Sequence, residues 1–160
     1  MPGFEVGLGL GSNIGDKAAN IAEAMRRLVL SGKVAVTAMS ALYRTEPWGK
    51  VDQDFFANAA ALVTTHLSPL ELLDLVKKAE TDMGRQLTER WGPRLIDIDV
   101  LFYADLKLDT PRLKLPHVEL FNRAFVLVPL AEIAPGLVIG GREIAAAARL
   151  MADEGVKRWR

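Results

Sequence analysis

The chain has 160 residues, of which 50% are hydrophobic and 25% charged, the composition of an ordinary globular domain with its own core. Its 20 basic and 20 acidic side chains balance, which disfavours non-specific nucleic-acid binding because that activity depends on an excess of Lys and Arg. The absence of Cys excludes disulfides, thiolate metal sites and cysteine nucleophiles.

The first part of the chain predicts a strand, a helix and two further strands. Residues 4–10 alternate apolar side chains with Glu and Gly, which is the pattern of a half-buried strand. Asp16 is a suitable N-cap for the amphipathic helix that follows it. Strands are then expected over 34–43 and 55–65, with a loop over 44–54 between them.

The second part begins with the capping box Ser68-Pro69-Leu70-Glu71, which predicts a helix that ends at Gly84. A strand over 95–103 follows, rich in β-branched and aromatic residues. Further elements are expected near 106–108 (a short strand), over about 118–134 and over 144–151 (both helical). The order β-α-β-β-α-β predicts a ferredoxin-like α+β sandwich, with both helices on one face of an antiparallel sheet and C-terminal helical additions.

Alternation along the strands sorts the side chains onto two faces of this sheet. The aliphatic rows are expected to face the helices, and on the last strand these are Ile96, Ile98, Val100 and Phe102. The opposite face is expected to show two carboxylates, an amide, an aromatic ring and a bare glycine floor: Asp97, Asp99, Asn58, Phe56, Gly7 and Gly9. Alternation along the last strand places Leu95, Leu101 and Tyr103 on the same side. Such a combination favours a ligand site on that face.

Asp97 and Asp99 are two apart on a strand, so their Cα atoms lie about 6.5 Å apart on one side. Divalent cations relieve the repulsion of such a pair, and Mg²⁺ prefers few carboxylates plus phosphate oxygens. Three arginines in the preceding loop could bind those phosphates: Arg85, Arg90 and Arg94. The alternatives are two solvated aspartates on an open face and a solvated basic loop.

The segment Arg90-Trp91-Gly92-Pro93-Arg94-Leu95-Ile96-Asp97-Ile98-Asp99-Val100-Leu101 closely resembles the signature of the 6-hydroxymethyl-7,8-dihydropterin pyrophosphokinase family. The similarity extends from about residue 5 to 138. It includes Gly11-Ser12-Asn13, Tyr43-Arg44-Thr45-Glu46-Pro47-Trp48-Gly49, Phe56-Ala57-Asn58-Ala59-Ala60, Glu80, Gly84-Arg85, Pro116-His117, Asn122-Arg123-Ala124-Phe125 and Pro129-Leu130.

This resemblance implies transfer of pyrophosphate from ATP to the pterin alcohol, with AMP as the leaving group, in folate biosynthesis. It implies that Asp97 and Asp99 hold two Mg²⁺ ions and act in catalysis together with Arg85 and Arg94. It assigns the pterin to Thr45, Pro47, Trp48, Phe56, Asn58 and Phe125, with the two Phe rings stacking on it. It assigns ATP to Glu80, Arg90, Trp91, Ile98, Arg112, His117 and Arg123.

Several positions depart from the family pattern. Phe56 replaces a commoner Tyr, Val118 stands where an aromatic residue is frequent, and Lys114 replaces a smaller polar residue. The loop over 86–89 is shorter than in some relatives and contains no Arg. For Trp91 and Phe125, packing into the protein interior is the competing interpretation.

Two other functions fit the same order of elements. A nucleotidyl transferase would use the paired aspartates but release pyrophosphate, and an RNA-recognition module would stack bases on aromatic residues of the first and third strands. The first strand here offers glycine instead. No signal peptide or membrane-length apolar run is present. We expect one domain over 1–160 in a cytoplasmic monomer that binds small molecules, neither nucleic acid nor membrane.

Overall fold

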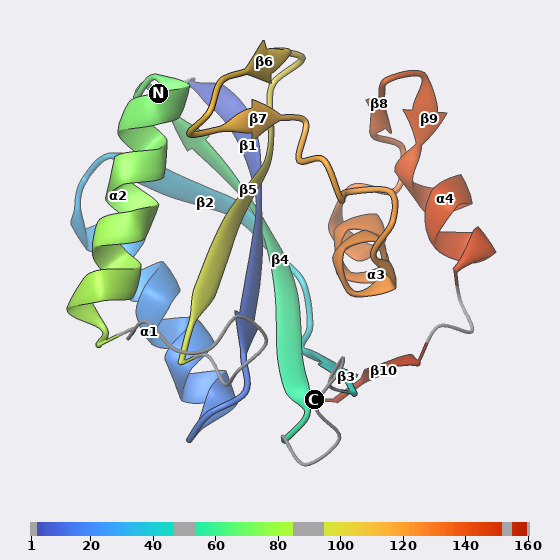
Figure 1. Cartoon of the computed structure of the whole chain (residues 1–160), viewed down its shortest axis with the longest axis horizontal. Helices are drawn as coiled ribbons and strands as arrows, with labels where there is room; N and C mark the ends of the chain where they lie inside the picture. Colours follow the sequence, from blue (N-terminus) through green and yellow to red (C-terminus); the bar gives the residue numbers. More distant parts are fainter. Residues whose placement is uncertain (1–2, 47–53, 85–94, 152–154, 160) are drawn as a thin grey trace.

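An antiparallel β-sheet lies between two pairs of helices in the computed structural model, which describes residues 3–46, 54–84, 95–151 and 155–159 (Figure 1). The elements in chain order are β1 (Phe4–Ser12), α1 (Lys17–Leu30), β2 (Val34–Met39), β3 (Tyr43–Thr45), β4 (Phe56–Thr65), α2 (Pro69–Asp82), β5 (Asp97–Tyr103), β6 (Leu108–Asp109), β7 (Lys114–Leu115), α3 (Ala124–Ile133), β8 (Val138–Ile139), β9 (Arg142–Glu143), α4 (Ile144–Leu150) and β10 (Val156–Arg158).

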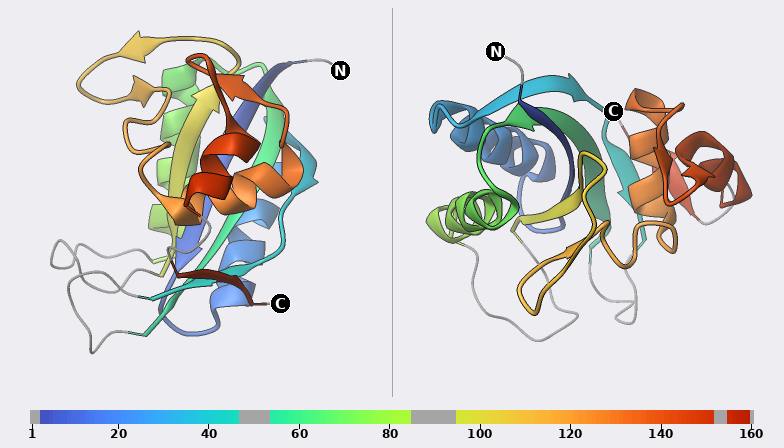
Figure 2. Two further views of the ribbon diagram at one scale, coloured as in Figure 1. Left: turned by 90° about the vertical axis from the view of Figure 1, so that its right-hand side faces the viewer. Right: turned by 90° about the horizontal axis from the view of Figure 1, so that it is seen from above.

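The main sheet has the strand order β10-β3-β4-β1-β5, and β2 also pairs with β4. Every pairing in it is antiparallel. Helices α1 and α2 cover one face, and α3 and α4 lie on the other side of the sheet (Figure 2). The expected α+β fold with an antiparallel sheet is confirmed.

Both predicted helix starts are confirmed by their capping contacts. Asp16 Oδ1 accepts a hydrogen bond from the Ala19 amide at 3.1 Å. The capping box before α2 is complete, because the Ser68 amide donates to Glu71 Oε1 at 2.9 Å and the Glu71 amide donates to Ser68 Oγ at 3.3 Å. Each contact satisfies a backbone N–H that the first helical turn leaves without a partner.

The strand expected over 34–43 is in fact two strands, β2 and β3. Both pair with β4, but residues 40–42 between them belong to neither strand. The Ser40 hydroxyl accepts a hydrogen bond from the Ala60 amide at 2.9 Å, so a side chain stands where the sheet ladder would continue. Farther along, the short strand expected near 106–108 begins at Leu108, and the helix expected from about 118 begins only at Ala124.

The sheet separates two hydrophobic cores. The core facing α1 and α2 takes the alternate residues expected of it, among them Leu8, Leu10, Ala57, Ala59, Ala61, Val63, Ile96, Ile98 and Val100. The core facing α3 and α4 contains Ala60, Leu62, Leu101, Phe102, Leu127 and Leu130. The second core covers part of the face that the sequence left open for a ligand.

A β-bulge in β5 overturns part of the predicted face assignment. Gly7 pairs with Phe102, but Leu8 pairs with Val100, so Leu101 is the extra residue of β5. The alternation therefore slips by one position. Phe102 joins Leu101 in the core beneath α3 and α4, and Tyr103 turns to the α1–α2 side, the reverse of the expectation for both.

The expectation of a bare glycine floor is also wrong at both of its positions, Gly7 and Gly9. A Cβ built on Gly7 would collide with the Phe102 ring, and one on Gly9 would lie 3.4 Å from Leu101 Cδ2. Gly7 leaves room for the Phe102 ring, and Leu101 packs over Gly9 at van der Waals distance, so side chains of the second core cover both glycines.

Gly7→Ala is therefore expected to lower the free energy of unfolding by about 1–3 kcal/mol, because the added methyl group must displace a ring that is packed in the core. Urea denaturation followed by circular dichroism measures the change. Gly136→Ala is the matched control, since its Cβ would meet no atom within 4 Å. Equal stability of the two variants would contradict the packing argument.

Candidate active site

The paired aspartates lie in register with the amide predicted to share their face. Asp97 of β5 is opposite Gly11 of β1, and Gly11 is opposite Asn58 of β4. Directly opposed residues of antiparallel strands project to the same side of a sheet. Asp97, Asp99 and Asn58 therefore share one face, with a residue that has no side chain between the carboxylate and the amide.

Asn58 is held in place from two directions. Its side chain is buried, and its Nδ2 donates a hydrogen bond to Thr45 Oγ1 at 2.8 Å. A Cβ on Gly11 would lie 3.0 Å from its Oδ1, so the amide packs closely over the glycine. Thr45 in turn pairs with Phe56 across β3 and β4. Three residues assigned to the pterin thus form one cluster at the start of β4.

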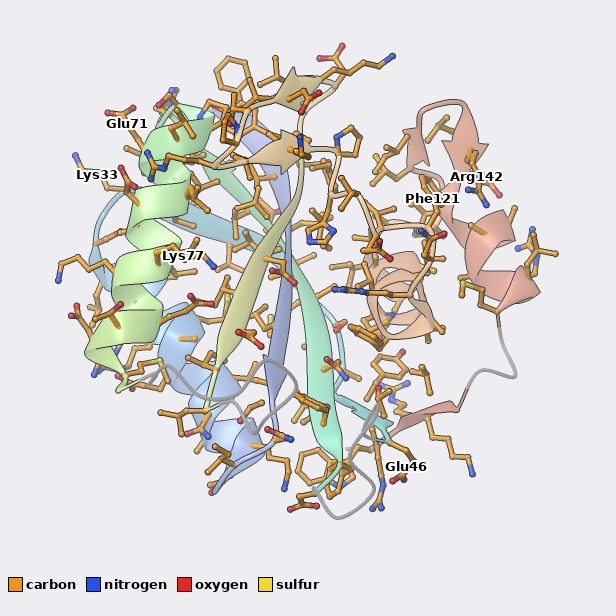
Figure 3. The ribbon with its side chains drawn as sticks, in the orientation of Figure 1. Lys33, Glu46, Glu71, Lys77, Phe121 and Arg142 are labelled. Atoms are coloured by element: carbon orange, nitrogen blue, oxygen red, sulfur yellow. The ribbon has the colours of Figure 1, made fainter. Side chains whose placement is uncertain are left out.

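Glu80 of α2 contacts the backbone between the two aspartates. Its side chain is 2% exposed, and Oε2 accepts a hydrogen bond from the Ile98 amide at 2.6 Å. Because β5 is the edge strand of the sheet over the described residues, Glu80 supplies the acceptor for an amide that pairs with no described strand on that side. Lys77 Nζ lies 3.3 Å from Glu80 Oε1, and Figure 3 shows Lys77 extending from α2 on the β5 side.

His117 follows β7 and is fixed beside the bulge of β5. Its amide donates to the Leu101 carbonyl at 2.8 Å, and its Nδ1 accepts from the Glu119 amide at 3.0 Å. When Nδ1 is an acceptor, the neutral ring carries its proton on Nε2. His117 can therefore offer an Nε2–H donor to an anionic group.

Of the other described nucleotide candidates, Arg112 lies in the turn between β6 and β7, and Arg123 lies at the start of α3. Arg112 forms an exposed ion pair with Asp74 of α2. Arg123 immediately precedes α3, and its guanidinium carbon lies 5.6 Å from the centre of the Phe125 ring. Phe125 is half-buried and packs partly against the second core. Packing into the protein interior, the alternative to ligand stacking, therefore accounts for part of this ring.

Six predicted site residues lie outside the described residues: Pro47, Trp48, Arg85, Arg90, Trp91 and Arg94. Over the described ranges 3–46, 54–84, 95–151 and 155–159, no three His, Asp or Glu side chains form a metal-binding cluster. Two half-buried carboxylates remain on one strand face. This donor set fits Mg²⁺, which takes one or two protein carboxylates and completes its shell with phosphate oxygens and water.

Sequence reasoning missed a contact that joins β3 to α3. The Tyr43 hydroxyl donates to Glu132 Oε1 at 2.6 Å, and the Ala41 amide donates to the same carboxylate. Burial of the hydroxyl is the main cause that raises the pKa of Tyr43 to about 12, and the hydrogen bond to Glu132 is the second. Glu132 is an exposed polar residue of α3, as the solvent side of any helix would have, so no sequence pattern marks it as a partner of Tyr43.

The family model described as 7,8-dihydro-6-hydroxymethylpterin-pyrophosphokinase matches residues 7–135. The chain belongs to this family. That range includes most of β1 and all of β4 and β5, the three strands that bring Asp97, Asp99 and Asn58 together. It ends before the last helix and strand, α4 and β10.

Two curated relatives of the family match almost end to end. The chain is 52% identical to the 2-amino-4-hydroxy-6-hydroxymethyldihydropteridine pyrophosphokinase of Methylorubrum extorquens, over 94% of this chain and 96% of that protein. It is 39% identical to the protein of the same name from Pseudomonas aeruginosa, over 93% of each.

Solved structures of low sequence identity share the fold. An HPPK-DHPS chain in complex with substrates superimposes with a TM-score of 0.78 at 15% identity, and the wild-type HPPK-DHPS of Plasmodium falciparum with a TM-score of 0.75 at 19% identity. Alignment covers 99% and 97% of this chain but only 47% and 45% of those longer chains. Among the described residues, no helix has the length and apolar character needed to cross a membrane.

Proposed function

We propose that the chain transfers pyrophosphate from ATP to 6-hydroxymethyl-7,8-dihydropterin, giving the pterin diphosphate and AMP in folate biosynthesis. Membership of the pyrophosphokinase family and the end-to-end relatives support this activity. The structural observation that carries it is the cross-strand row Asp97–Gly11–Asn58, which sets a pair of carboxylates beside a fixed amide on one face.

The pterin binds at the β3–β4 end of this row. Asn58 hydrogen-bonds the edge of the ring system, because its amide is already oriented by Thr45 and can present a complementary group without further ordering. Phe56 stacks on one face of the ring, with Phe125 on the other. Pro47 and Trp48 complete the pterin site from the loop before β4.

ATP binds at the β5 end. Asp97 and Asp99 hold two Mg²⁺ ions, and bound Mg²⁺ neutralises phosphate oxygens and the charge that develops on transfer. Arg85 and Arg94 neutralise the remaining phosphate charge as catalytic residues. The nucleotide contacts come from Arg90, Trp91, Ile98, Arg112, His117 and Arg123. Glu80 acts on this site through the Ile98 amide.

Positioning and charge neutralisation account for the chemistry, since pyrophosphoryl transfer needs no protein nucleophile. The donor at His117 Nε2 suits a phosphate or ribose oxygen, because the Glu119 amide holds the ring in that tautomer. The pterin hydroxyl oxygen bonds to the β-phosphorus of ATP and gives up its proton to solvent. The bond between the β-phosphorus and the bridging oxygen of the α-phosphate breaks, so AMP leaves.

We also propose the finer description of the molecule. The strand order β2/β3-β4-β1-β5 with α1 and α2 on one face supports a ferredoxin-like β-α-β-β-α-β sandwich with C-terminal helical additions. The chain forms one pyrophosphokinase domain over 1–160, acts as a monomer on small molecules in the cytoplasm, and binds neither nucleic acid nor membranes.

The decisive assay incubates the protein with ATP, Mg²⁺ and hydroxymethyl dihydropterin and separates the nucleotide products. AMP that forms only when the pterin is present supports the proposal. Release of pyrophosphate would instead identify a nucleotidyl transferase, and absence of turnover would reject both.

Asn58→Ala is expected to raise the pterin KM by about 5–150-fold, since the lost hydrogen bonds are worth about 1–3 kcal/mol, while the ATP KM stays unchanged. Steady-state kinetics with each substrate varied in turn measures both constants. Thr45→Val, which leaves the Asn58 amide in place but removes its acceptor, should raise the pterin KM less. His66→Ala, at an exposed position after β4, is the control. A larger change in the ATP KM than in the pterin KM would move Asn58 out of the pterin site.

A further inference from the structure

The last strand of the chain pairs with the short strand that carries part of the proposed pterin site. Val156 of β10 pairs with Thr45, and Arg158 pairs with Tyr43. The Trp159 amide extends this ladder by donating to the Leu42 carbonyl at 2.8 Å. Figure 1 shows β10 beside β3 at the border of the sheet. The family model ends at residue 135, so this strand lies outside the matched range.

β3 is only three residues long, and it reaches only one end of β4. A strand of this length with a neighbour on one side alone would leave half of its backbone groups to water. β10 supplies the second neighbour. α3 also contacts both strands, and the Tyr43–Glu132 hydrogen bond joins β3 to that helix.

Trp159 adds a side-chain contact at the entrance to β4. Its ring packs edge-on against Phe55, with 5.1 Å between ring centres. Lys17 Nζ and Arg44 Cζ lie 4.3 Å and 4.1 Å from the centre of the same Phe55 ring. Lys17 is itself buried and paired with Asp54 at 2.7 Å. The C-terminal tail (β10 and Trp159), α1 and β3 therefore all contribute a side chain that contacts Phe55, the residue just before Phe56.

One contact of β10 and Trp159 is with β3, which carries Thr45, and the other is with Phe55, the neighbour of Phe56. β3 carries Thr45, whose hydroxyl accepts from the Asn58 amide, and Phe56 is opposite Thr45. We propose that β10 and Trp159 form a positioning element for the pterin site, which holds β3 and Phe55 in place so that Thr45, Asn58 and Phe56 are ordered before the pterin arrives. This proposal rests on the proposed function for the identity of the ligand.

Trp159→Ala is expected to raise the pterin KM by about 3–10-fold, the equivalent of one aromatic pair, while kcat and the ATP KM change by less than about twofold. Trp159→Phe retains an aromatic ring and should restore most of the loss. Leu150→Ala, which shortens an 83% exposed side chain of α4, is the control from the same C-terminal region. An unchanged pterin KM in Trp159→Ala, or an equal rise in both KM values, would overturn the proposal.

Amide hydrogen exchange of the free protein tests the structural half of the proposal without any substrate. Faster exchange over Tyr43–Thr45 and 55–58 in Trp159→Ala, with unchanged exchange in α2, supports it, whereas unchanged exchange over Tyr43–Thr45 overturns it. If the wild-type protein failed to turn over the pterin, the proposed function would fall while this measurement still decided whether the tail orders β3. A variant that ends at Gly155 should show the same exchange pattern more strongly, and Trp159→Ala decides the question if that variant does not fold.

Discussion

Replacing either Asp97 or Asp99 with Ala is expected to reduce AMP formation by at least about 10³-fold, the effect of removing a main electrostatic contribution to transfer. Both carboxylates of β5 lie on the same face of the sheet as Asn58 of β4. The described residues around them hold no third acidic or histidine ligand in a cluster that could take over the metal. Neither carboxylate therefore has a substitute among the residues that the structure describes.

The same substitutions should leave the fold intact. Asp97 and Asp99 are half-buried and project from one strand face, where two like charges repel each other. Removing one charge relieves this repulsion, so the thermal midpoint should change little. Asp97→Asn and Asp99→Asn, which keep the side-chain shape, should be as inactive as the Ala variants.

Asp105→Ala is the matched control for these variants. It removes an exposed carboxylate from the turn just after β5 and should retain full activity. Activity is measured as AMP release at saturating ATP and pterin over a range of Mg²⁺ concentrations. Turnover that survived in Asp97→Ala or Asp99→Ala at any Mg²⁺ concentration would show that the metal is held elsewhere.

The site face could be predicted as far as the strand period holds. Asp97, Asp99 and Asn58 fell on one face because alternation along β4 and along the first half of β5 is regular. The prediction failed beyond Val100, where Leu101 inserts an extra residue. Nothing in the apolar run Val100-Leu101-Phe102 marks which residue is extra, since all three are suited to a core.

Contacts between distant segments were the other features that sequence patterns did not reveal. At Ser40, between β2 and β3, a hydroxyl replaces the backbone as the acceptor for the Ala60 amide of β4. The sequence does not distinguish this serine from one on the surface. β10 has a short and mostly polar sequence, and it forms a strand by pairing with β3. The Glu132 carboxylate reaches Tyr43 across 89 residues of sequence. These elements depend on partners that only the folded chain brings near.

Glu80→Ala is expected to lower both activity and stability, because it leaves the buried Ile98 amide without its acceptor. An unsatisfied buried donor costs about 1–3 kcal/mol, and the cavity left by the side chain adds to this. The backbone that loses its support lies between Asp97 and Asp99. Misplacing these carboxylates should lower kcat by about 10-fold or more and raise the Mg²⁺ concentration for half-maximal rate.

The kinetic pattern separates this role from direct nucleotide binding. A carboxylate that is 2% exposed, with one oxygen on the Ile98 amide and the other beside Lys77, has little surface left for ATP. Glu80→Ala should therefore change kcat and the Mg²⁺ dependence while the affinity for metal-free ATP stays within about twofold. A loss of metal-free ATP affinity equal to the loss in kcat/KM would show that Glu80 contacts the nucleotide itself.

Two further variants separate local support from general loosening of the α2–β5 contact. Glu80→Gln keeps an oxygen that can accept from the Ile98 amide and should recover much of the activity that Glu80→Ala loses. Tyr103→Phe removes a hydrogen bond to the Leu67 carbonyl at the far end of β5, beside the start of α2. It should lower stability by about 1 kcal/mol yet leave kcat and the Mg²⁺ dependence unchanged. If Tyr103→Phe lost activity in proportion to its loss of stability, α2 would act on the aspartates through packing alone. If only the Glu80 variants lost activity, the single hydrogen bond to the Ile98 amide would set the position of Asp97 and Asp99.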